Sequence, residues 1–223
     1  MKNIAIFGST GSIGQSTLRV AGIFKNKLRV IALTANSNTD LLYKQIKLFR
    51  PSMVCLKDEA LAVRLKRRLG GMKIKMLLGE SGLREIASHK EVDQVVMAIS
   101  GSSALSPLLS AIECGKRIAL ANKEALVMAG PIIMRKAVRH KAMIIPVDSE
   151  QSAIWQCLVS EDRGKLKRIY LTASGGPLLK AGARELKDIS VERVLRHPRW
   201  SMGRKISVDS ATRMNKGLER LET

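Results

Sequence analysis

Short apolar segments rich in β-branched residues alternate along this chain with longer segments whose apolar residues recur at helical spacing. The strand-like segments are residues 3–7, 28–33, 53–56, 94–99, 117–121, 142–147 and 168–172. The helix-like segments are residues 12–24, 40–49, 59–69, 105–114, 123–139 and 149–158. Because parallel strands need crossover connections, which are usually helices, this order predicts an α/β fold with a doubly wound parallel sheet.

The composition of the sequence changes after Ser174, where glycine, proline and charged residues become dominant. Neither an internal repeat nor a low-complexity linker marks the change. We interpret this region as the loop-rich beginning of a second domain.

The composition excludes several classes of protein. With 223 residues, 45% of them hydrophobic, the chain can bury a substantial core. Polar or charged residues interrupt every apolar run before it reaches the length of a membrane span, and the first residues enter a strand pattern without a signal peptide. We therefore expect a cytoplasmic protein without a membrane partner. Three well-separated cysteines predict reduced, mostly buried thiols rather than disulfides or a zinc site.

The formal net charge of +20 raises the question of nucleic-acid binding. The cations, however, are scattered along helix-like segments, and only 3% of the residues are aromatic, so few side chains can stack on bases. A specific nucleic-acid partner is therefore not expected. The charge favours small anions such as phosphorylated metabolites.

A glycine-rich segment, G-S-T-G-S-I-G-Q at residues 8–15, lies between the first expected strand and the first expected helix. Glycines there allow a tight turn and let the backbone approach a pyrophosphate at the helix N-terminus, as in Rossmann-like domains. The G-x-x-G-x-x-G spacing is a variant found in NADP-dependent enzymes; the alternative is a glycine turn without a ligand. After the second strand, Asn36, Ser37 and Asn38 precede the first acid, Asp40, which favours NADP(H) over NAD(H).

Two carboxylates flank a serine in D-S-E at residues 148–150, directly after an apolar run. Their spacing alone is compatible with a helix start, an acid/base pair or half of a metal site. Four other segments also carry chemically active residues: A-N-K-E-A-L (121–126), T-A-S-G-G-P (172–177), H-P-R-W-S-M-G-R-K (197–205) and V-D-S-A-T-R-M-N-K-G-L-E (208–219). Each of these is ambiguous by itself.

Taken together and in this order, G-S-T-G-S-I-G, A-N-K-E, P-V-D-S-E, S-G-G-P, H-P-x-W-x-M-G-x-K and V-D-S-A-T-x-M-N-K-G-L-E resemble the 1-deoxy-D-xylulose 5-phosphate reductoisomerase family. The resemblance extends from Met1 to about Glu219. It implies an oxidoreductase of non-mevalonate isoprenoid biosynthesis. Such an enzyme rearranges the carbon skeleton of a phosphorylated ketose and reduces the product with NADPH, giving 2-C-methyl-D-erythritol 4-phosphate. It also implies Mn²⁺ or Mg²⁺, hard ions that carboxylate oxygens bind well.

The resemblance assigns roles to individual residues. The implied metal ligands are Asp148, Glu150 and Glu219, which with Lys123 and His197 form the implied catalytic set. The implied substrate contacts are Lys123, Ser149, Glu150, Ser174, His197, Ser210, Asn215, Lys216 and Glu219, with Ser174, Ser210, Asn215 and Lys216 on the phosphate. His197 belongs to an implied lid with Trp200 and Met202. The implied NADPH site comprises Thr10, Gly11, Ser12, Ile13, Asn36, Ser37, Asn38, Asn122, Glu124 and Gly203.

The resemblance also sets an expected domain organisation: an NADPH-binding Rossmann-like domain at residues 1–147 and an incomplete α+β catalytic domain at residues 148–223. The family's C-terminal helical domain and the shared sheet of its homodimer are expected to be absent from this shortened chain. Because Glu219 is four residues from the last residue, we expect its helix end to fray.

The chain departs from the family at residues 36–37, where many members have glycine followed by lysine or arginine. Losing that cation predicts a weaker grip on a 2′-phosphate. The sequence is compatible with three hypotheses: an active reductoisomerase, a catalytically incompetent fragment that serves only as a nucleotide-binding module, and a basic nucleic-acid binder.

Overall fold

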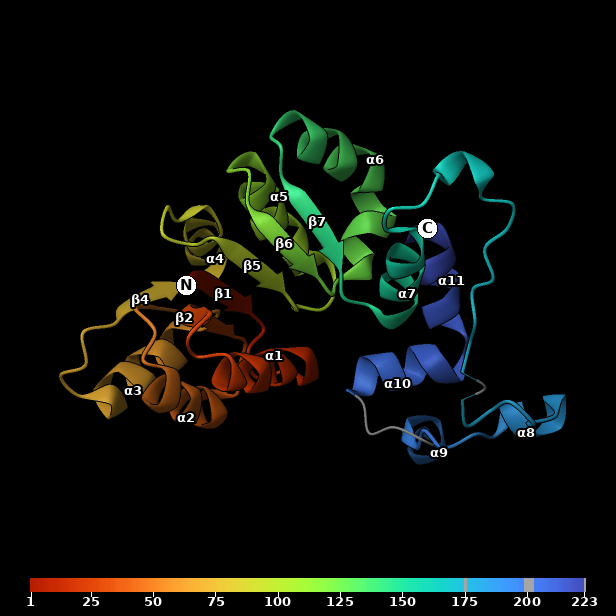
Figure 1. The fold of residues 1–223 in the computed structure, drawn as a ribbon. Coiled ribbons are helices and arrows are strands. Elements are labelled where there is room, and N and C mark those ends of the chain that lie inside the picture. Colours follow the sequence, from red (N-terminus) through yellow and green to blue (C-terminus); the bar gives the residue numbers. More distant parts are fainter. Residues whose placement is uncertain (175, 199–202, 223) are drawn as a thin grey trace. The chain divides into compact units, whose positions relative to one another are not determined.

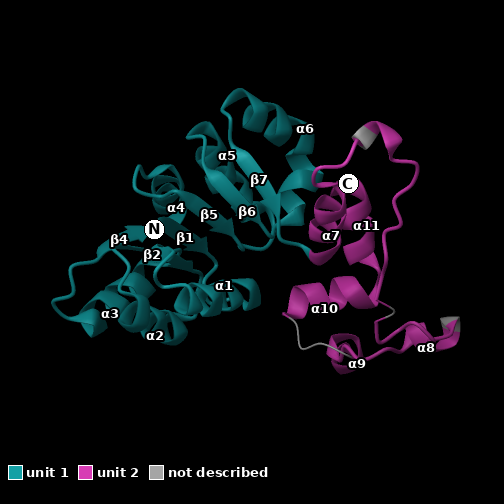
Figure 2. Ribbon diagram, in the orientation of Figure 1, with its two compact units in different colours: residues 1–148 teal, residues 149–223 magenta. Residues whose placement is uncertain are grey.

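The structure is a computed structural model that describes residues 1–174, 176–198 and 203–222. The chain forms two compact units, residues 1–148 (unit 1) and residues 149–223 (unit 2), which Figure 2 shows in different colours. Trp200 and Met202, expected to belong to a lid, lie outside the described residues.

Unit 1 contains a seven-stranded parallel sheet in the order β4-β3-β2-β1-β5-β6-β7 (Figure 1). From β1 the chain adds β2, β3 and β4 in turn on one side. It then returns to add β5, β6 and β7 on the other side of β1. This is the predicted α/β doubly wound architecture, and it is confirmed. The strands are β1 (Lys2–Phe7), β2 (Leu28–Ala35), β3 (Met53–Leu56), β4 (Lys75–Leu78), β5 (Gln94–Met97), β6 (Arg117–Leu120) and β7 (Met143–Pro146).

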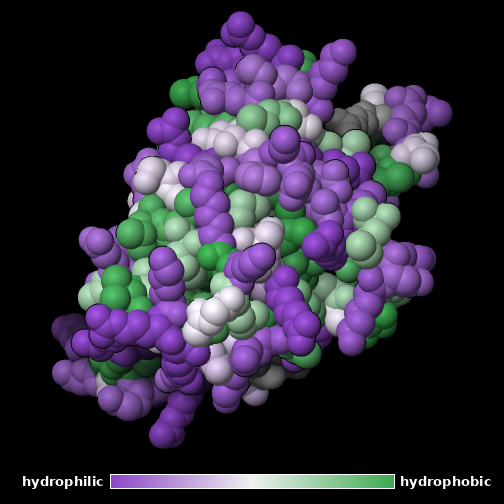
Figure 3. All heavy atoms as spheres, turned by 90° about the vertical axis from the view of Figure 1, so that its left-hand side faces the viewer, coloured by the Kyte–Doolittle hydropathy of each residue, from purple (hydrophilic) through white to green (hydrophobic). Residues whose placement is uncertain are grey.

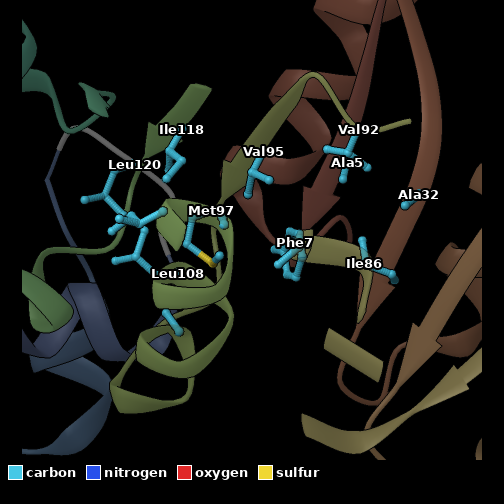
Figure 4. Packing of buried hydrophobic residues seen from close by; sticks show 14 of the residues in the cluster. Ala5, Phe7, Ala32, Ile86, Val92, Val95, Met97, Leu108, Ile118 and Leu120 are labelled. Atoms are coloured by element: carbon cyan, nitrogen blue, oxygen red, sulfur yellow. The ribbon is translucent and has the colours of Figure 1, made fainter. Parts of the chain in front are cut away.

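Helices cover both faces of this sheet, which explains why its central strands are apolar on both sides. The helices of unit 1 are α1 (Ser12–Ile23), α2 (Thr39–Phe49), α3 (Glu59–Leu69), α4 (Gly79–Ser88), η1 (Ser102–Ala104), α5 (Leu105–Glu113) and α6 (Lys123–Arg139). Side chains of α1, α2 and α3 pack with Ile4 and Ile6 of β1. Those of α4, α5 and α6 pack with Phe7 on the opposite face, where Figure 4 shows Met97 beside Leu108.

The structure differs from the sequence-based prediction in two places. β4 and α4 were not predicted. Within the described residues β4 is an edge strand whose single partner is β3, and it is partly exposed, so its sequence lacks the continuous buried run of the central strands. The expected strand at residues 168–172 is wrong: the segment has no regular structure, and Tyr170 is 76% exposed. Its composition suits a strand, but a strand needs a hydrogen-bonded neighbour.

In the described part of unit 2, all regular elements are helices. Its elements are α7 (Ser149–Leu158), η2 (Arg163–Lys165), α8 (Ala183–Lys187), α9 (Val191–Leu195), α10 (Arg204–Ala211) and α11 (Met214–Glu222). Within residues 149–174, 176–198 and 203–222 no strand is assigned. The long connections around α8 and α9 agree with the glycine- and proline-rich composition of this part of the sequence.

The surface is rich in charge. The face that Figure 3 presents is mostly hydrophilic, with hydrophobic residues in small groups between charged side chains. Among the described residues, no helix combines the length and apolarity that a membrane span requires. Cys55 is buried, as expected for a core thiol, but Cys114 and Cys157 are exposed, so the expectation of mostly buried cysteines is wrong.

Candidate functional site

The glycine-rich segment forms a tight loop between β1 and α1. Gly8 adopts a left-handed conformation with φ of +79°, and a Cβ there would lie 2.6 Å from the carbonyl oxygen of Ala98. At Gly14, a Cβ would lie 2.3 Å from the Gly8 carbonyl oxygen and 2.6 Å from the Cα of Ser9. All three distances are too short for any side chain. Gly8 therefore lets the loop lie against the segment that follows β5, and Gly14 lets the first turn of α1 rest directly on Gly8 and Ser9.

The N-terminus of α1 is suited to bind an anion. Its N-cap is Gly11, which has no side chain to cap the helix, and no acidic residue lies in the first turn. The N–H groups of a first turn have no partner within the helix. Thr10 is half-buried, whereas Gly11, Ser12 and Ile13 are exposed, so solvent and ligands reach these groups. The helix dipole adds positive potential at the same point.

The residues that follow β2 lie on the surface. Asn36, Ser37 and Asn38 are all exposed. The side chain of Asn38 caps α2 by accepting a 3.1 Å hydrogen bond from the N–H of Leu41. Asp40, in the first turn of α2, forms an ion pair with Arg68 of α3. The first acid after β2 is thus paired with a cation, and amide and hydroxyl groups precede it.

Asn122 is 1% exposed and links the end of β6 to the segment that follows β5. Its Oδ1 caps α6 by accepting from the N–H of Ala125 at 2.8 Å. Its Nδ2 lies 2.8 Å from the carbonyl oxygen of Ile99, 3.0 Å from that of Gly101 and 3.0 Å from Oε2 of Glu124. The side chain therefore fixes the backbone at the carboxyl ends of two neighbouring strands.

Lys123, the first residue of α6, is 6% exposed and forms an ion pair with Asp148 at the end of unit 1. Its Nζ lies 2.5 Å from Oδ2 of Asp148. Asp148 follows β7, two residues after its last residue. The pair joins the carboxyl edge of the sheet to α6, and a buried ammonium is stable there because the carboxylate compensates it.

In unit 2, Lys216 of α11 lies between two carboxylates. Its Nζ is 2.7 Å from Oε1 of Glu150 in α7, and it also forms an ion pair with Glu219 one turn along α11. We call Glu150, Lys216 and Glu219 the carboxylate–lysine cluster. Burial raises the pKa of Glu150, but hydrogen bonds from Lys216 and Ser149 outweigh it and hold that pKa below its usual value. Burial lowers the pKa of Lys216, and hydrogen bonds to both carboxylates outweigh this and raise it.

Glu219 is 0% exposed and is held from several directions, although it stands near the last residue. Asn215 donates a hydrogen bond to its Oε1, and Gln151 of α7 donates to its backbone carbonyl oxygen at 3.2 Å. The expectation that this end of the chain frays around Glu219 is therefore wrong. The helix is anchored because its carboxylate and its backbone both bond to neighbouring groups.

The remaining expected residues of unit 2 gather around one loop. The Ser174 hydroxyl lies 2.9 Å from Nε2 of His197. Gly176, with φ of +62°, packs so closely on α10 that a Cβ would lie 3.1 Å from the carbonyl oxygen of Ser210. Ser174, His197 and Ser210 thus lie close together in unit 2. Gly203 is exposed and forms the N-cap of α10.

Some residues of these sites were not identified from the sequence. Gln151 anchors Glu219, and Ser9, Thr34 and Gln45 hold the glycine loop through hydrogen bonds. A signal for Gln45 exists in the sequence, since it lies between apolar positions of α2 where a polar residue needs a buried partner. No comparable pattern marks Gln151.

The donors of the carboxylate–lysine cluster fit a hard divalent cation. One carboxylate oxygen of Glu150 and one of Glu219 lie within 4.8 Å of each other. Two ligands of one Mg²⁺ are at most about 4.2 Å apart, twice the bond length of ~2.1 Å, so the two carboxylates lie in the range of distances that one ion requires. Asp148 is two residues from Glu150 in the sequence. Oxygen ligands of this kind are those that Mg²⁺ and Mn²⁺ prefer.

Two family models match the chain. Residues 4–130 match the model described as 1-deoxy-D-xylulose 5-phosphate reductoisomerase, and residues 144–223 match the C-terminal domain model of the same description.

Curated relatives carry the same name. The reductoisomerase of Pelotomaculum thermopropionicum is 47% identical over 223 residues, which are 100% of this chain and 58% of the relative. That of Chlorobaculum tepidum is 50% identical over 222 residues, 100% of this chain and 58% of the relative. The chloroplastic enzyme of Mentha piperita is 47% identical over 223 residues, 99% of this chain and 47% of the relative. The chain thus spans roughly half the length of these relatives.

Solved structures are similar as well. A DOX-P reductoisomerase in complex with NADPH, fosmidomycin and magnesium matches with a TM-score of 0.94 and 43% identity, over 100% of this chain and 57% of that one. The enzyme from Zymomonas mobilis in complex with NADPH matches with a TM-score of 0.89 and 39% identity, over 99% of this chain and 57% of that one.

Proposed function

The chain belongs to the 1-deoxy-D-xylulose 5-phosphate reductoisomerase family, and from this premise we propose that it binds NADPH and a divalent cation and acts on 1-deoxy-D-xylulose 5-phosphate. The proposed reaction rearranges the carbon skeleton and reduces the product to 2-C-methyl-D-erythritol 4-phosphate. The observation that carries the proposal is the combination, in one chain of this family, of a glycine loop built for a pyrophosphate and a carboxylate–lysine cluster suited to a metal.

NADPH is the proposed ligand of the glycine loop, with its pyrophosphate at the first turn of α1. The N–H groups of the exposed residues Ser12 and Ile13 would donate to it, and Gly11, whose own N–H donates to the Gly8 carbonyl oxygen at 3.0 Å, would line the site. Asn36 and Ser37 would donate to the 2′-phosphate, because their neutral side chains do not repel it and the nearby Asp40 is paired with Arg68. When bound, NADPH supplies the hydride for the reduction.

The proposed metal ligands are Asp148, Glu150 and Glu219, which offer only oxygen donors. Bound there, Mg²⁺ or Mn²⁺ supplies a Lewis acid for the oxygens of the substrate. Glu150 is suited to this role because its lowered pKa keeps it ionised at neutral pH. Lys123 would hold Asp148 in position through their ion pair.

The substrate's phosphate would be held by Ser174, Ser210, Asn215 and Lys216, with His197 hydrogen-bonded to Ser174. Hydroxyl and amide groups supply hydrogen bonds, and Lys216 supplies the positive charge. Because Lys216 also compensates Glu150 and Glu219, one ammonium group would serve two purposes. Ser149, which donates to Glu150 at 2.5 Å, would contact the oxygens near the metal.

The decisive experiment measures NADPH oxidation by the chain with 1-deoxy-D-xylulose 5-phosphate and Mn²⁺. Oxidation that depends on both additions is expected. Asp148→Asn should abolish it while NADPH still binds, whereas Asp162→Asn, the same change at an exposed carboxylate, should leave it intact.

Two results would count against the proposal. Unchanged turnover in Asp148→Asn would refute the assignment of this ligand. NADPH binding without any oxidation by the unaltered chain would restrict its function to nucleotide binding.

A further inference from the structure

Gln45 of α2 is a polar residue in an apolar environment. It is 6% exposed, and its helix neighbours Leu42 and Ile46 are fully buried in the core between α2 and the sheet. A buried amide costs free energy unless its donors and its acceptor find partners. The amide of Gln45 finds these partners in Ser9.

Gln45 and Ser9 form a reciprocal, buried pair. The Ser9 hydroxyl donates to Oε1 of Gln45 at 2.7 Å, and Nε2 of Gln45 donates to the Ser9 carbonyl oxygen at 2.9 Å. Ser9 is 0% exposed. The two residues lie 36 positions apart in the sequence, so the pair fastens the glycine loop to α2.

Thr34 of β2 completes the attachment of the loop. The N–H of Ser9 donates to the Thr34 carbonyl oxygen at 2.8 Å, and the N–H of Gly8 donates to Oγ1 of Thr34 at 3.0 Å. The hydroxyl, N–H and carbonyl groups of Ser9 are thus all bonded to α2 or β2. These bonds attach residue 9 to both the sheet and α2.

The position of Ser9 determines where α1 begins. Gly14 packs directly on it, since a Cβ at Gly14 would lie 2.6 Å from the Cα of Ser9. The first turn of α1 therefore packs directly against the backbone of Ser9. A displacement of Ser9 would be passed to the exposed residues Gly11, Ser12 and Ile13, which lie between the two residues in contact.

We propose that Gln45 is a positioning residue of the dinucleotide site: through Ser9 it sets the backbone of the glycine loop so that the first turn of α1 meets a pyrophosphate. This inference rests on the proposed function only in naming NADPH as the ligand. Gln45 itself is buried in the core and acts through Ser9.

The test compares two variants of α2 by hydrogen exchange and by NADPH titration. Gln45→Met keeps the volume of the side chain but removes both hydrogen bonds. Ile46→Val, the matched control, removes one buried methylene from the adjacent position without touching Ser9. Exchange of the amides of residues 9–14 should be faster in Gln45→Met than in Ile46→Val, and the Kd for NADPH should rise roughly tenfold in Gln45→Met only.

A second pair of variants shows whether Gln45 acts through Ser9. Ser9→Ala should raise the Kd in the same direction, and the double variant Ser9→Ala with Gln45→Met should raise it by less than the product of the two single effects. Loop exchange in Gln45→Met equal to that in Ile46→Val would overturn the inference, as would fully multiplicative effects on Kd. If the unaltered chain does not bind NADPH, the proposed function fails, and the exchange rates alone decide whether Gln45 positions the loop.

Discussion

In the glycine loop of unit 1, the groups offered to a ligand are backbone N–H groups, whereas in the carboxylate–lysine cluster of unit 2 they are side chains. The loop stands at the end of β1, and hydrogen bonds to Thr34 and Gln45 fix it to β2 and α2. The cluster depends on ion pairs between α7 and α11, and α7 contributes no fully buried residue. A site made of backbone groups, such as the glycine loop, has almost no room for an added atom. A site made of side chains, such as the carboxylate–lysine cluster, depends on the balance between its carboxylates and its ammonium group.

The largest expected effect tests the first half of this comparison. Gly14→Ala would place a Cβ 2.3 Å from the Gly8 carbonyl oxygen, so α1 must move away from the loop. We expect the Kd for NADPH to rise at least about 100-fold, or roughly 2.7 kcal/mol. Fluorescence titration with NADPH measures this.

Gly22→Ala is the matched control in the same helix, because a Cβ there meets nothing within 4 Å. It should leave NADPH binding unchanged and stabilise the helix by up to about 1 kcal/mol. Equal loss of binding in both variants would show that general damage to α1, and not the contact with Gly8, is responsible.

The second effect tests the charge balance of unit 2. Lys216→Met leaves Glu150 and the fully buried Glu219 without the ammonium between them, and should lower the free energy of unfolding by about 1–3 kcal/mol. Mn²⁺ should restore part of the loss, since a divalent cation can replace the charge. Urea denaturation with and without Mn²⁺ measures both quantities.

Lys205→Met provides the control for this variant. Lys205 pairs with Asp209 at 2.6 Å but its side chain is 48% exposed, so the expected loss is at most about 1 kcal/mol. A loss as large as that in Lys216→Met would mean that exposure does not determine the strength of these pairs.

A smaller effect is the response of unit 2 to acid. The pKa of Glu150 lies below its ordinary value of 4.5, so its ionised form stabilises the fold above that pH, and this contribution is lost as the pH falls through the folded-state pKa. The difference in unfolding free energy between the unaltered chain and Glu150→Gln should therefore be constant near neutral pH and shrink below about pH 4. A difference that grows on acidification would contradict the assignment.

The smallest effect concerns the thiols and leaves the stability unchanged. Burial, followed by the charge of Glu85, raises the pKa of Cys55 in β3 to about 12, whereas Cys157 in α7 is exposed. We expect iodoacetamide at neutral pH to label Cys157 and Cys114 in the folded chain, and Cys55 only after unfolding. Mass spectrometry of the labelled peptides detects the order. Early labelling of Cys55 would show that the sheet opens more readily than its packing indicates.

The same contrast explains how much the sequence could predict. The glycine loop was predictable because its requirements are local: Gly8 and Gly14 stand at fixed distances from a strand and a helix start. The central strands were predictable because burial on both faces makes them continuously apolar. β4 was missed because an edge strand lacks that pattern, and residues 168–172 were assigned wrongly because composition does not reveal whether a neighbouring strand exists.

The residues of the carboxylate–lysine cluster were assigned to a site only through resemblance to a family, and the ion pairs that Lys216 forms with Glu150 and Glu219 were not predicted. Lys216 and Glu150 lie 66 positions apart, and no periodicity within either helix indicates that they meet. The burial of Glu219 was likewise unpredictable, since it depends on Asn215 and Lys216 within α11 and on Gln151 in α7. Side-chain sites assembled by tertiary packing leave little local trace in a sequence.

The most direct test of this account is a paired titration of NADPH and Mn²⁺ on two variants, Gly14→Ala and Glu150→Gln. We expect a crossed result: Gly14→Ala loses NADPH binding and keeps Mn²⁺ binding, while Glu150→Gln keeps NADPH binding and loses most of its affinity for Mn²⁺. Loss of both ligands in either folded variant, or retention of Mn²⁺ affinity in Glu150→Gln, would contradict it.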